Sequence, residues 1–224
     1  RWLLFAGGSI AWALIFWSGA RGAALAFVLA LPVIATVARQ CERKHMLCRC
    51  FFAALLGASL SFLYPIDDPA FGLLRFYTTT VETDSFHNLT TSRSELWAEA
   101  IMHWQRAPWF GVGAGHTLLV LKTAGGQFAQ PHNIVIQALL AWGVVGALPF
   151  LALIAGLLWR AAQAVQRAAP GNGAGGAAGL MMALALLGNA MLDAALYYPL
   201  PTWLFVIGLC VALAGAQGML GSGP

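Results

Sequence analysis

The chain has 224 residues, of which 60% are hydrophobic and 9% are charged. Soluble globular domains usually carry about 25% charged residues, so this composition excludes an ordinary water-soluble fold and indicates a membrane protein. The net charge of +4 comes from loops that flank apolar stretches, which favours membrane orientation over nucleic-acid binding.

Six apolar stretches follow one another along the chain, and several are shorter than the roughly 20 residues of a full span. They predict an all-α fold, a polytopic bundle of about six transmembrane helices. Three belong to residues 1–64 and three to residues 132–224, separated by a long loop at 65–131. The stretches are Trp2 to Trp17, Ala23 to Ala38, Phe51 to Tyr64, Ile134 to Trp159, Ala177 to Tyr198 and Leu200 to Ala216.

Basic residues mark two loops as cytoplasmic, because Lys and Arg concentrate on that side of bacterial membranes. One loop lies between the second and third stretches and the other between the fourth and fifth; their basic residues are Arg39, Arg43, Lys44, Arg49, Arg160 and Arg167. Alternation then places the turn at 18–22, the long loop and the turn at 198–201 on the periplasmic side. The Gly- and Ala-rich stretch at 171–179 predicts a flexible cytoplasmic connection.

The long loop contains one expected helix, at about 93–106. Ser92 and Glu95 have the spacing of a capping box, and an apolar stripe that includes Trp97 follows at helical spacing until Pro108. Such a helix suits the membrane surface or the side of the bundle.

Cysteine spacing argues against a disulfide framework and favours reduced thiols. Cys41, His45, Cys48 and Cys50 form a conceivable zinc site, but their spacing fits no familiar zinc pattern. The simpler interpretation is a set of unligated cytoplasmic thiols.

Two arginines on the periplasmic side are candidates for anion binding. Arg21 lies in a Ser-Gly-Ala-Arg-Gly turn, and Arg93 lies in the first turn of the expected helix, where free N–H groups favour an anion. Planar guanidinium groups bind phosphate oxygens in pairs and keep their charge, which suits a diphosphate without a metal ion. The alternatives are a snorkelling role for Arg21 and a carboxylate partner such as Glu95 for Arg93.

His132 is the candidate catalytic base, because it stands at the periplasmic mouth of the fourth stretch, where a neutral imidazole can take a proton from a hydroxyl. A helix cap is the simpler alternative. Asp193 lies inside the fifth apolar stretch, where a carboxylate is costly and therefore a functional candidate or the partner of a buried arginine.

In this order the motifs resemble those of the O-antigen ligase family, which includes O-antigen polymerases and oligosaccharyltransferases that modify proteins. The resemblance covers about the first 150 residues. It rests on the Ser18–Gly22 turn, Arg93-Ser-Glu-Leu-Trp, Pro108-Trp-Phe-Gly-Val-Gly113, and His132-Asn133 followed by Gln137, Gly143 and Gly146. A whole member has about a dozen spans, so the resemblance implies that this chain is part of a longer one.

The resemblance implies an inner-membrane glycosyltransferase, with its site facing the periplasm, that moves a glycan from undecaprenyl diphosphate to lipid A-core and inverts the anomeric centre. Arg21 and Arg93 would bind the diphosphate and His132 would activate the acceptor, with no metal and no cofactor. Asn133, Asp193, Trp97 and Gly113 would support the site.

One departure from the family concerns the residues before Gly143, where some relatives carry an acid and this chain has Ala141 and Trp142. The stretch from Asp193 to Pro199 is similar to that of protein-modifying members. Polymerisation and transfer to protein therefore stay open as alternatives, and a lipid or polysaccharide transporter is the alternative of another class. A transporter should show broken helices near the middle of the bilayer.

Overall fold

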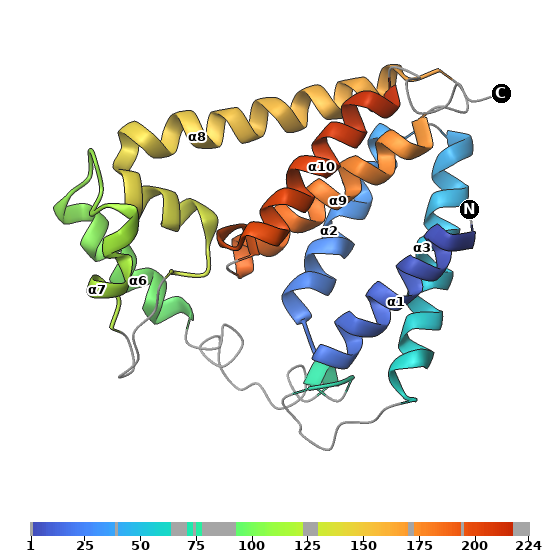
Figure 1. Ribbon diagram of the computed structural model, residues 1–224, viewed down its shortest axis with the longest axis horizontal. Helices are drawn as coiled ribbons and strands as arrows, with labels where there is room; N and C mark the ends of the chain where they lie inside the picture. The colour runs from blue at the N-terminus through green and yellow to red at the C-terminus, as the bar shows by residue number, and fades with distance from the viewer. Residues whose placement is uncertain are drawn as a thin grey trace.

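The computed structural model describes residues 2–38, 40–63, 71–73, 75–77, 93–122, 130–169, 173–193 and 195–216. Within these ranges every regular element is a helix, which bears out the all-α prediction (Figure 1). The expected capping residue Ser92 lies outside the described residues.

Seven longer helices and three short turns of helix make up the described chain. In order they are α1 (Trp2–Ser18), α2 (Arg21–Val37), α3 (Gln40–Ser61), α6 (Arg93–Arg106), η1 (Ala114–His116), α7 (Thr117–Val120), α8 (Ile134–Arg167), α9 (Gly173–Leu192), η3 (Ala195–Tyr197) and α10 (Pro199–Ala216).

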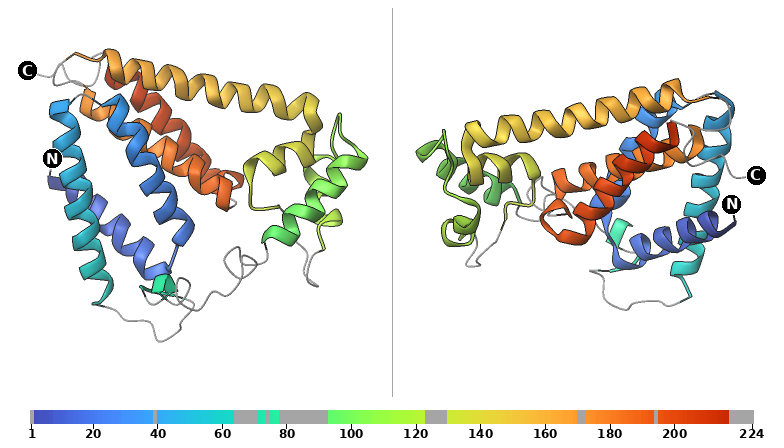
Figure 2. Two further views of the ribbon diagram at one scale, coloured as in Figure 1. Left: turned by 180° about the vertical axis from the view of Figure 1, so that it is seen from behind. Right: turned by 45° about the horizontal axis from the view of Figure 1, so that its top comes forward.

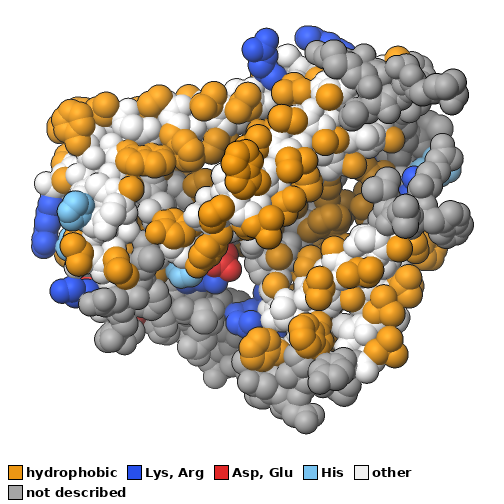
Figure 3. All heavy atoms as spheres, viewed as in Figure 1, with side chains coloured by type: hydrophobic (Ala, Val, Ile, Leu, Met, Phe, Trp, Pro, Cys, Tyr) orange, Lys and Arg blue, Asp and Glu red, His pale blue; other side chains and the backbone are white. Residues whose placement is uncertain are grey.

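Two of the described helices, α8 and α9, are long and apolar enough to cross a membrane, while α1, α2 and α10 are apolar but shorter. The number of six spans therefore stays a prediction. Large hydrophobic side chains such as Leu29, Leu153 and Trp203 are exposed on these helices, and Figure 3 shows apolar side chains spread over the viewed face. Such a surface suits contact with lipid.

Three segments differ from the expectation drawn from the sequence. The basic stretch after residue 39 is the first half of α3, because Gln, Glu, Arg, Lys, Met and Leu are good helix formers and the stretch contains neither Gly nor Pro. The glycine-rich segment expected to be flexible is helical from Gly173 onward. Helix α9 ends at Leu192, so Asp193 follows the helix and is not inside a span.

Close contact between α9 and α10 explains why a glycine-rich segment is helical. A Cβ added to Gly179 would come within 2.6 Å of the backbone oxygen of Gly208, and one added to Gly208 within 2.8 Å of the oxygen of Gly179. Small residues at such a crossing let two backbones approach, which is how helices associate in membranes. Helix propensity measured in water is therefore overridden by packing.

The main core lies between α2, α8, α9 and α10. It contains buried small side chains together with a few large ones, among them Ile34, Leu180 and Phe205. A second cluster joins Leu96 of α6 to Leu140 of α8. Figure 2 shows this arrangement from two directions: α6 packs on the first part of α8, with α7 near them, at the opposite end of the molecule from the α1–α3 pair.

Helix α8 is interrupted at Gly143, which has φ 60° and ψ −169°. The loop that begins at Pro108 fills the interruption. On one side, the N–H groups of Val112 and Gly113 donate to the oxygens of residues 140 and 141; on the other, the N–H groups of residues 144 and 145 donate to the oxygens of Pro108 and Trp109. Every one of these backbone groups at the break is thus hydrogen-bonded, as a low-dielectric setting requires.

Candidate functional site

His132 stands immediately before α8 and has a left-handed backbone, with φ 54°. Few residues other than glycine adopt this conformation, and where they do the surrounding structure has to hold it. The next residue, Asn133, caps the helix: its side-chain oxygen accepts from the N–H groups of Val135 at 3.0 Å and Ile136 at 3.1 Å. Its amide nitrogen donates to the backbone oxygen of Met191 at 3.0 Å, which ties the start of α8 to the end of α9.

Asp193 contacts the imidazole directly. The distance between His132 Nδ1 and Asp193 Oδ1 is 2.8 Å. A carboxylate at Nδ1 favours the tautomer with hydrogen on that nitrogen, and the lone pair then resides on Nε2. The pair therefore has the arrangement of an oriented general base.

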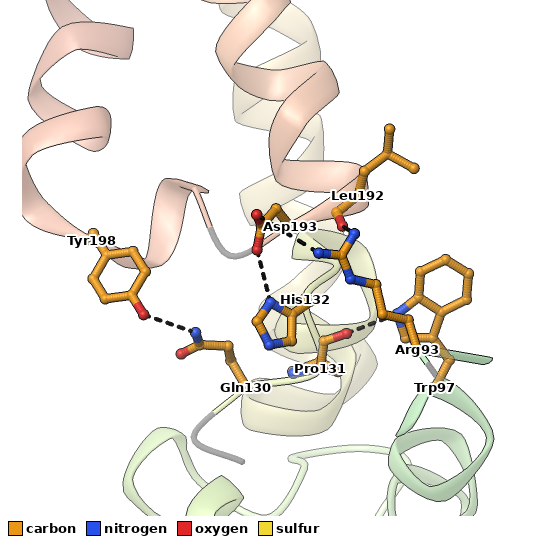
Figure 4. A network of polar contacts seen from close by, with 8 residues as sticks. All are labelled: Arg93, Trp97, Gln130, Pro131, His132, Leu192, Asp193 and Tyr198. Carbon is orange, nitrogen blue, oxygen red and sulfur yellow. Dashed lines mark hydrogen bonds and ion pairs between the residues drawn. The ribbon is translucent and has the colours of Figure 1, made fainter. Parts of the chain in front are cut away.

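Arg93 reaches the same carboxylate from the other side. Its Nη2 lies 3.8 Å from Asp193 Oδ2, and its Nη1 donates to the backbone oxygen of Leu192. Figure 4 shows the imidazole and the guanidinium meeting at Asp193. The carboxylate partner of Arg93 seen here is thus Asp193, whereas the sequence suggested Glu95.

Trp97 holds helix α6 against this cluster. Its indole N–H donates to the backbone oxygen of Pro131 at 2.7 Å, next to His132 (Figure 4). The structure therefore gathers five of the residues singled out from the sequence: Arg93, Trp97, His132, Asn133 and Asp193.

Gly113 has a different place from the rest. It belongs to the loop that fills the break in α8, where its φ is 91° and its N–H donates to the oxygen of Ala141 at 3.0 Å. In this place it shapes the backbone of the loop.

Arg21 lies at the turn between α1 and α2, and the structure adds a neighbour that the sequence did not reveal. The N–H of Gly72 donates to the oxygen of Trp17 at 2.9 Å, and the ring of Phe76 packs edge-on against Phe16 with centroids 5.8 Å apart. These contacts seat Arg75 at the same turn.

The guanidinium of Arg21 therefore has two other arginines in its electrostatic surroundings. The positive charges of Arg75 and Arg93 both act on the guanidinium of Arg21. Guanidinium groups gathered in this way can bind an anion between them. No sequence motif marks Arg75, because its place depends on how the 71–77 segment packs on α1.

A cavity of about 230 Å³ opens beside the imidazole. Polar side chains of Gln130, Gln137 and Asp193 line it together with the rings of Trp142 and Tyr197. The site thus combines a positive region, an oriented imidazole and a small, mostly apolar hollow.

The described side chains offer no metal site. No group of three His, Cys, Asp or Glu residues there has the geometry to hold an ion. Of the conceivable zinc ligands, Cys48 is exposed on α3 and the side chain of Cys41 lies outside the described ones.

Comparison with known proteins gives a consistent picture. A family model described as O-antigen ligase matches residues 6–151. An O-antigen ligase of Pseudomonas aeruginosa is 36% identical over 71 residues, which cover 30% of this chain and 18% of that protein. The chain thus spans only a small part of the curated relative that it matches, and no solved structure matches it.

Proposed function

The chain belongs to the O-antigen ligase family, and we propose that its full-length protein transfers a glycan from undecaprenyl diphosphate to lipid A-core. The observation that carries the proposal is the contact of His132 and Arg93 with one carboxylate, Asp193. A base for the acceptor and a cation for the leaving group then stand side by side, as transfer from a diphosphate requires.

The donor diphosphate binds among the guanidinium groups of Arg21, Arg75 and Arg93 in this proposal. Breaking the bond between the anomeric carbon and the diphosphate oxygen leaves an additional negative charge on the diphosphate. Fixed cations already in place stabilise that charge without reorganising, which is often the largest catalytic contribution. Three permanent charges can supply what a metal ion supplies elsewhere, so we propose that transfer needs no metal.

The acceptor hydroxyl gives its proton to His132. As Nε2 takes the proton, the acceptor oxygen forms its bond to the anomeric carbon on the face opposite the leaving diphosphate. One such displacement inverts the anomeric centre. Asp193 holds the ring and stabilises the positive imidazolium that forms.

Polymerases and protein oligosaccharyltransferases of the family are the nearest alternatives, and they differ from this proposal in the acceptor alone. A transporter is the alternative of another class, and the break in α8 is the kind of feature that transporters use to bind ions. Here, however, the backbone groups of the break at Gly143 are hydrogen-bonded to the 108–113 loop. A loop that fills the break in this way favours an enzyme over a transporter.

The site faces the periplasm of the bacterial inner membrane in this proposal. Arg160 and Arg167 lie toward the far end of α8 from His132, so the positive-inside rule assigns that far end to the cytoplasm. Figure 1 shows the end of α8 and the turn between α2 and α3 at the same end of the molecule.

The decisive experiment measures glycan transfer from undecaprenyl-diphosphate donor to lipid A-core by the full-length protein in EDTA. We expect the wild type to be active and His132→Ala to lose about 100-fold or more in rate, because general base catalysis contributes roughly 10²- to 10⁴-fold. His103→Ala, on α6 outside the cluster, is the matched control and should retain activity. An inactive wild type would exclude this reaction, and an active His132→Ala would assign His132 a structural role.

A further inference from the structure

The cavity beside His132 contains two buried polar atoms whose bonding is incomplete. The side-chain oxygens of Gln130 and Gln137 are both buried and have no hydrogen-bond partner in the described structure. Gln130 is only 6% exposed. A buried amide oxygen without a donor costs free energy, about 1–3 kcal/mol, so a pair of them beside one cavity calls for an explanation.

Both glutamines are held in place by their surroundings. The amide nitrogen of Gln130 lies 3.4 Å from the hydroxyl of Tyr198, and Figure 4 shows Gln130 beside the imidazole of His132. Gln137 lies one helical turn after Asn133, and its N–H donates to the backbone oxygen of that residue at 2.8 Å. The two side chains and His132 therefore line the same cavity from fixed backbone positions.

Resting on the proposed function, we propose that this cavity is the acceptor subsite and takes one sugar residue, whose hydroxyl groups donate hydrogen bonds to the side-chain oxygens of Gln130 and Gln137. A third hydroxyl of the same sugar points at His132 and is the one that reacts. Gln130 and Gln137 position the acceptor and take no proton themselves.

The chemistry of the lining agrees with a sugar. An amide oxygen can only accept, so its partner must bring a donor, and a sugar offers several hydroxyl donors on one rigid ring. The rings of Trp142, Phe150 and Tyr197 give the apolar surface on which the C–H face of such a ring can lie. A serine or threonine side chain has a single hydroxyl, and that hydroxyl would be the one that gives its proton to His132.

The size of the cavity agrees with one sugar as well. Its 230 Å³ corresponds to the liquid volume of about eight waters at roughly 30 Å³ each. That space suits a single monosaccharide unit, with the rest of the acceptor extending outside. The proposal therefore favours the end of a glycan over a protein side chain as the acceptor.

The reaction balances with these groups in place. The reacting hydroxyl loses its proton to His132 and its oxygen bonds to the anomeric carbon of the donor. The bond from that carbon to the diphosphate breaks, and undecaprenyl diphosphate leaves with the electron pair.

The test measures transfer by the full-length protein while acceptor and donor concentrations are varied separately. We expect Gln137→Leu and Gln130→Leu to raise the KM for lipid A-core about tenfold or more, because each removes an acceptor of a substrate hydrogen bond. The KM for the donor should stay within about twofold. Gln137→Glu keeps an oxygen acceptor and should restore most of the affinity. Gln105→Leu, an exposed glutamine on α6, is the matched control.

A binding measurement separates failure of this assignment from failure of the proposed reaction. Calorimetry with core oligosaccharide freed of lipid A should show binding to the wild type and about tenfold weaker binding to Gln137→Leu. Binding of this kind without any glycan transfer would refute the proposed reaction but keep the sugar subsite. Three outcomes would overturn the sugar assignment. The glutamine variants could leave the KM for acceptor unchanged, or they could raise the KM for donor as much as that for acceptor. A serine peptide could also bind in place of the oligosaccharide, in a way that depends on the glutamines.

Discussion

Asp193 is the residue on which the geometry of the site depends. Its two carboxylate oxygens approach different partners, the imidazole of His132 and the guanidinium of Arg93. Asp193 follows the last residue of α9, and the backbone oxygen of Leu192 adds a second contact to Arg93. The end of one helix thus positions an imidazole and a guanidinium that come from two other parts of the chain.

Asp193→Asn separates the charge of this residue from its shape. The amide oxygen can still accept from Nδ1 of His132, but the negative charge that stabilises the imidazolium is gone. We expect the kcat for glycan transfer to fall about tenfold or more, with a smaller change in the KM for donor. Steady-state kinetics checks this, and thermal unfolding of the same sample shows whether the fold is retained. A variant with normal kcat would show that the carboxylate serves structure alone.

At the scale of elements, the interruption of α8 is the feature that joins the neighbouring segments. Gly143 gives the backbone a positive φ, and Gly111 packs against it: a Cβ on Gly111 would lie 2.5 Å from the oxygen of Leu140. The inserted loop also presents Trp109 and Phe110, which are 66% and 75% exposed, as aromatic residues commonly are at a membrane interface. The break therefore joins the loop, helix α6 and the start of α8, where His132 stands.

Gly143→Ala should disrupt this junction. The new Cβ would lie 2.3 Å from the backbone of Trp109, and a non-glycine residue at positive φ is strained in addition. We expect a loss of about 3 kcal/mol or more in stability, combining backbone strain and overpacking of about 1–3 kcal/mol each. Thermal unfolding in detergent measures it. Gly156→Ala, farther along α8 with no atom within 4 Å of the added Cβ, is the control and should unfold at or above the wild-type temperature.

The candidate site lies at one end of the described molecule, and a second group of basic side chains lies at the other end (Figure 1). Arg43 and Lys44 lie in the first half of α3, and Arg167 is the last residue of α8. Positive charge of this kind stays in the cytoplasm during insertion. In the orientation that we propose, His132 and the arginines of the site face the periplasm.

Labelling of Cys48 tests this orientation. The thiol is exposed on the basic half of α3, so a full-length variant that keeps this cysteine alone should react with a membrane-impermeant maleimide in inverted vesicles and stay unlabelled in intact spheroplasts. A matched variant with its only cysteine at position 105, by Gln105→Cys on α6, should show the reverse pattern. Labelling of Cys48 from the periplasmic side would contradict the orientation.

The sequence by itself determined the all-helical class, the range of α6 and several residues of the cluster. Apolar runs and helix breakers are local signals, and His132, Asn133 and Arg93 stand in recognisable motifs. The family that these motifs indicated is confirmed by the match over residues 6–151.

The tertiary structure alone decided which residues meet. Asp193 pairs with both His132 and Arg93, and it is separated from His132 by 61 positions in the sequence. No local sequence pattern predicts a contact over such a separation. Arg75 and Gln130 were missed for the same reason, since their neighbours come from distant helices. Two segments expected to be loops are helical. The segment after residue 39 is helical because its residues have high helix propensity. The segment from residue 173 is helical because its small residues allow close packing against a neighbouring helix.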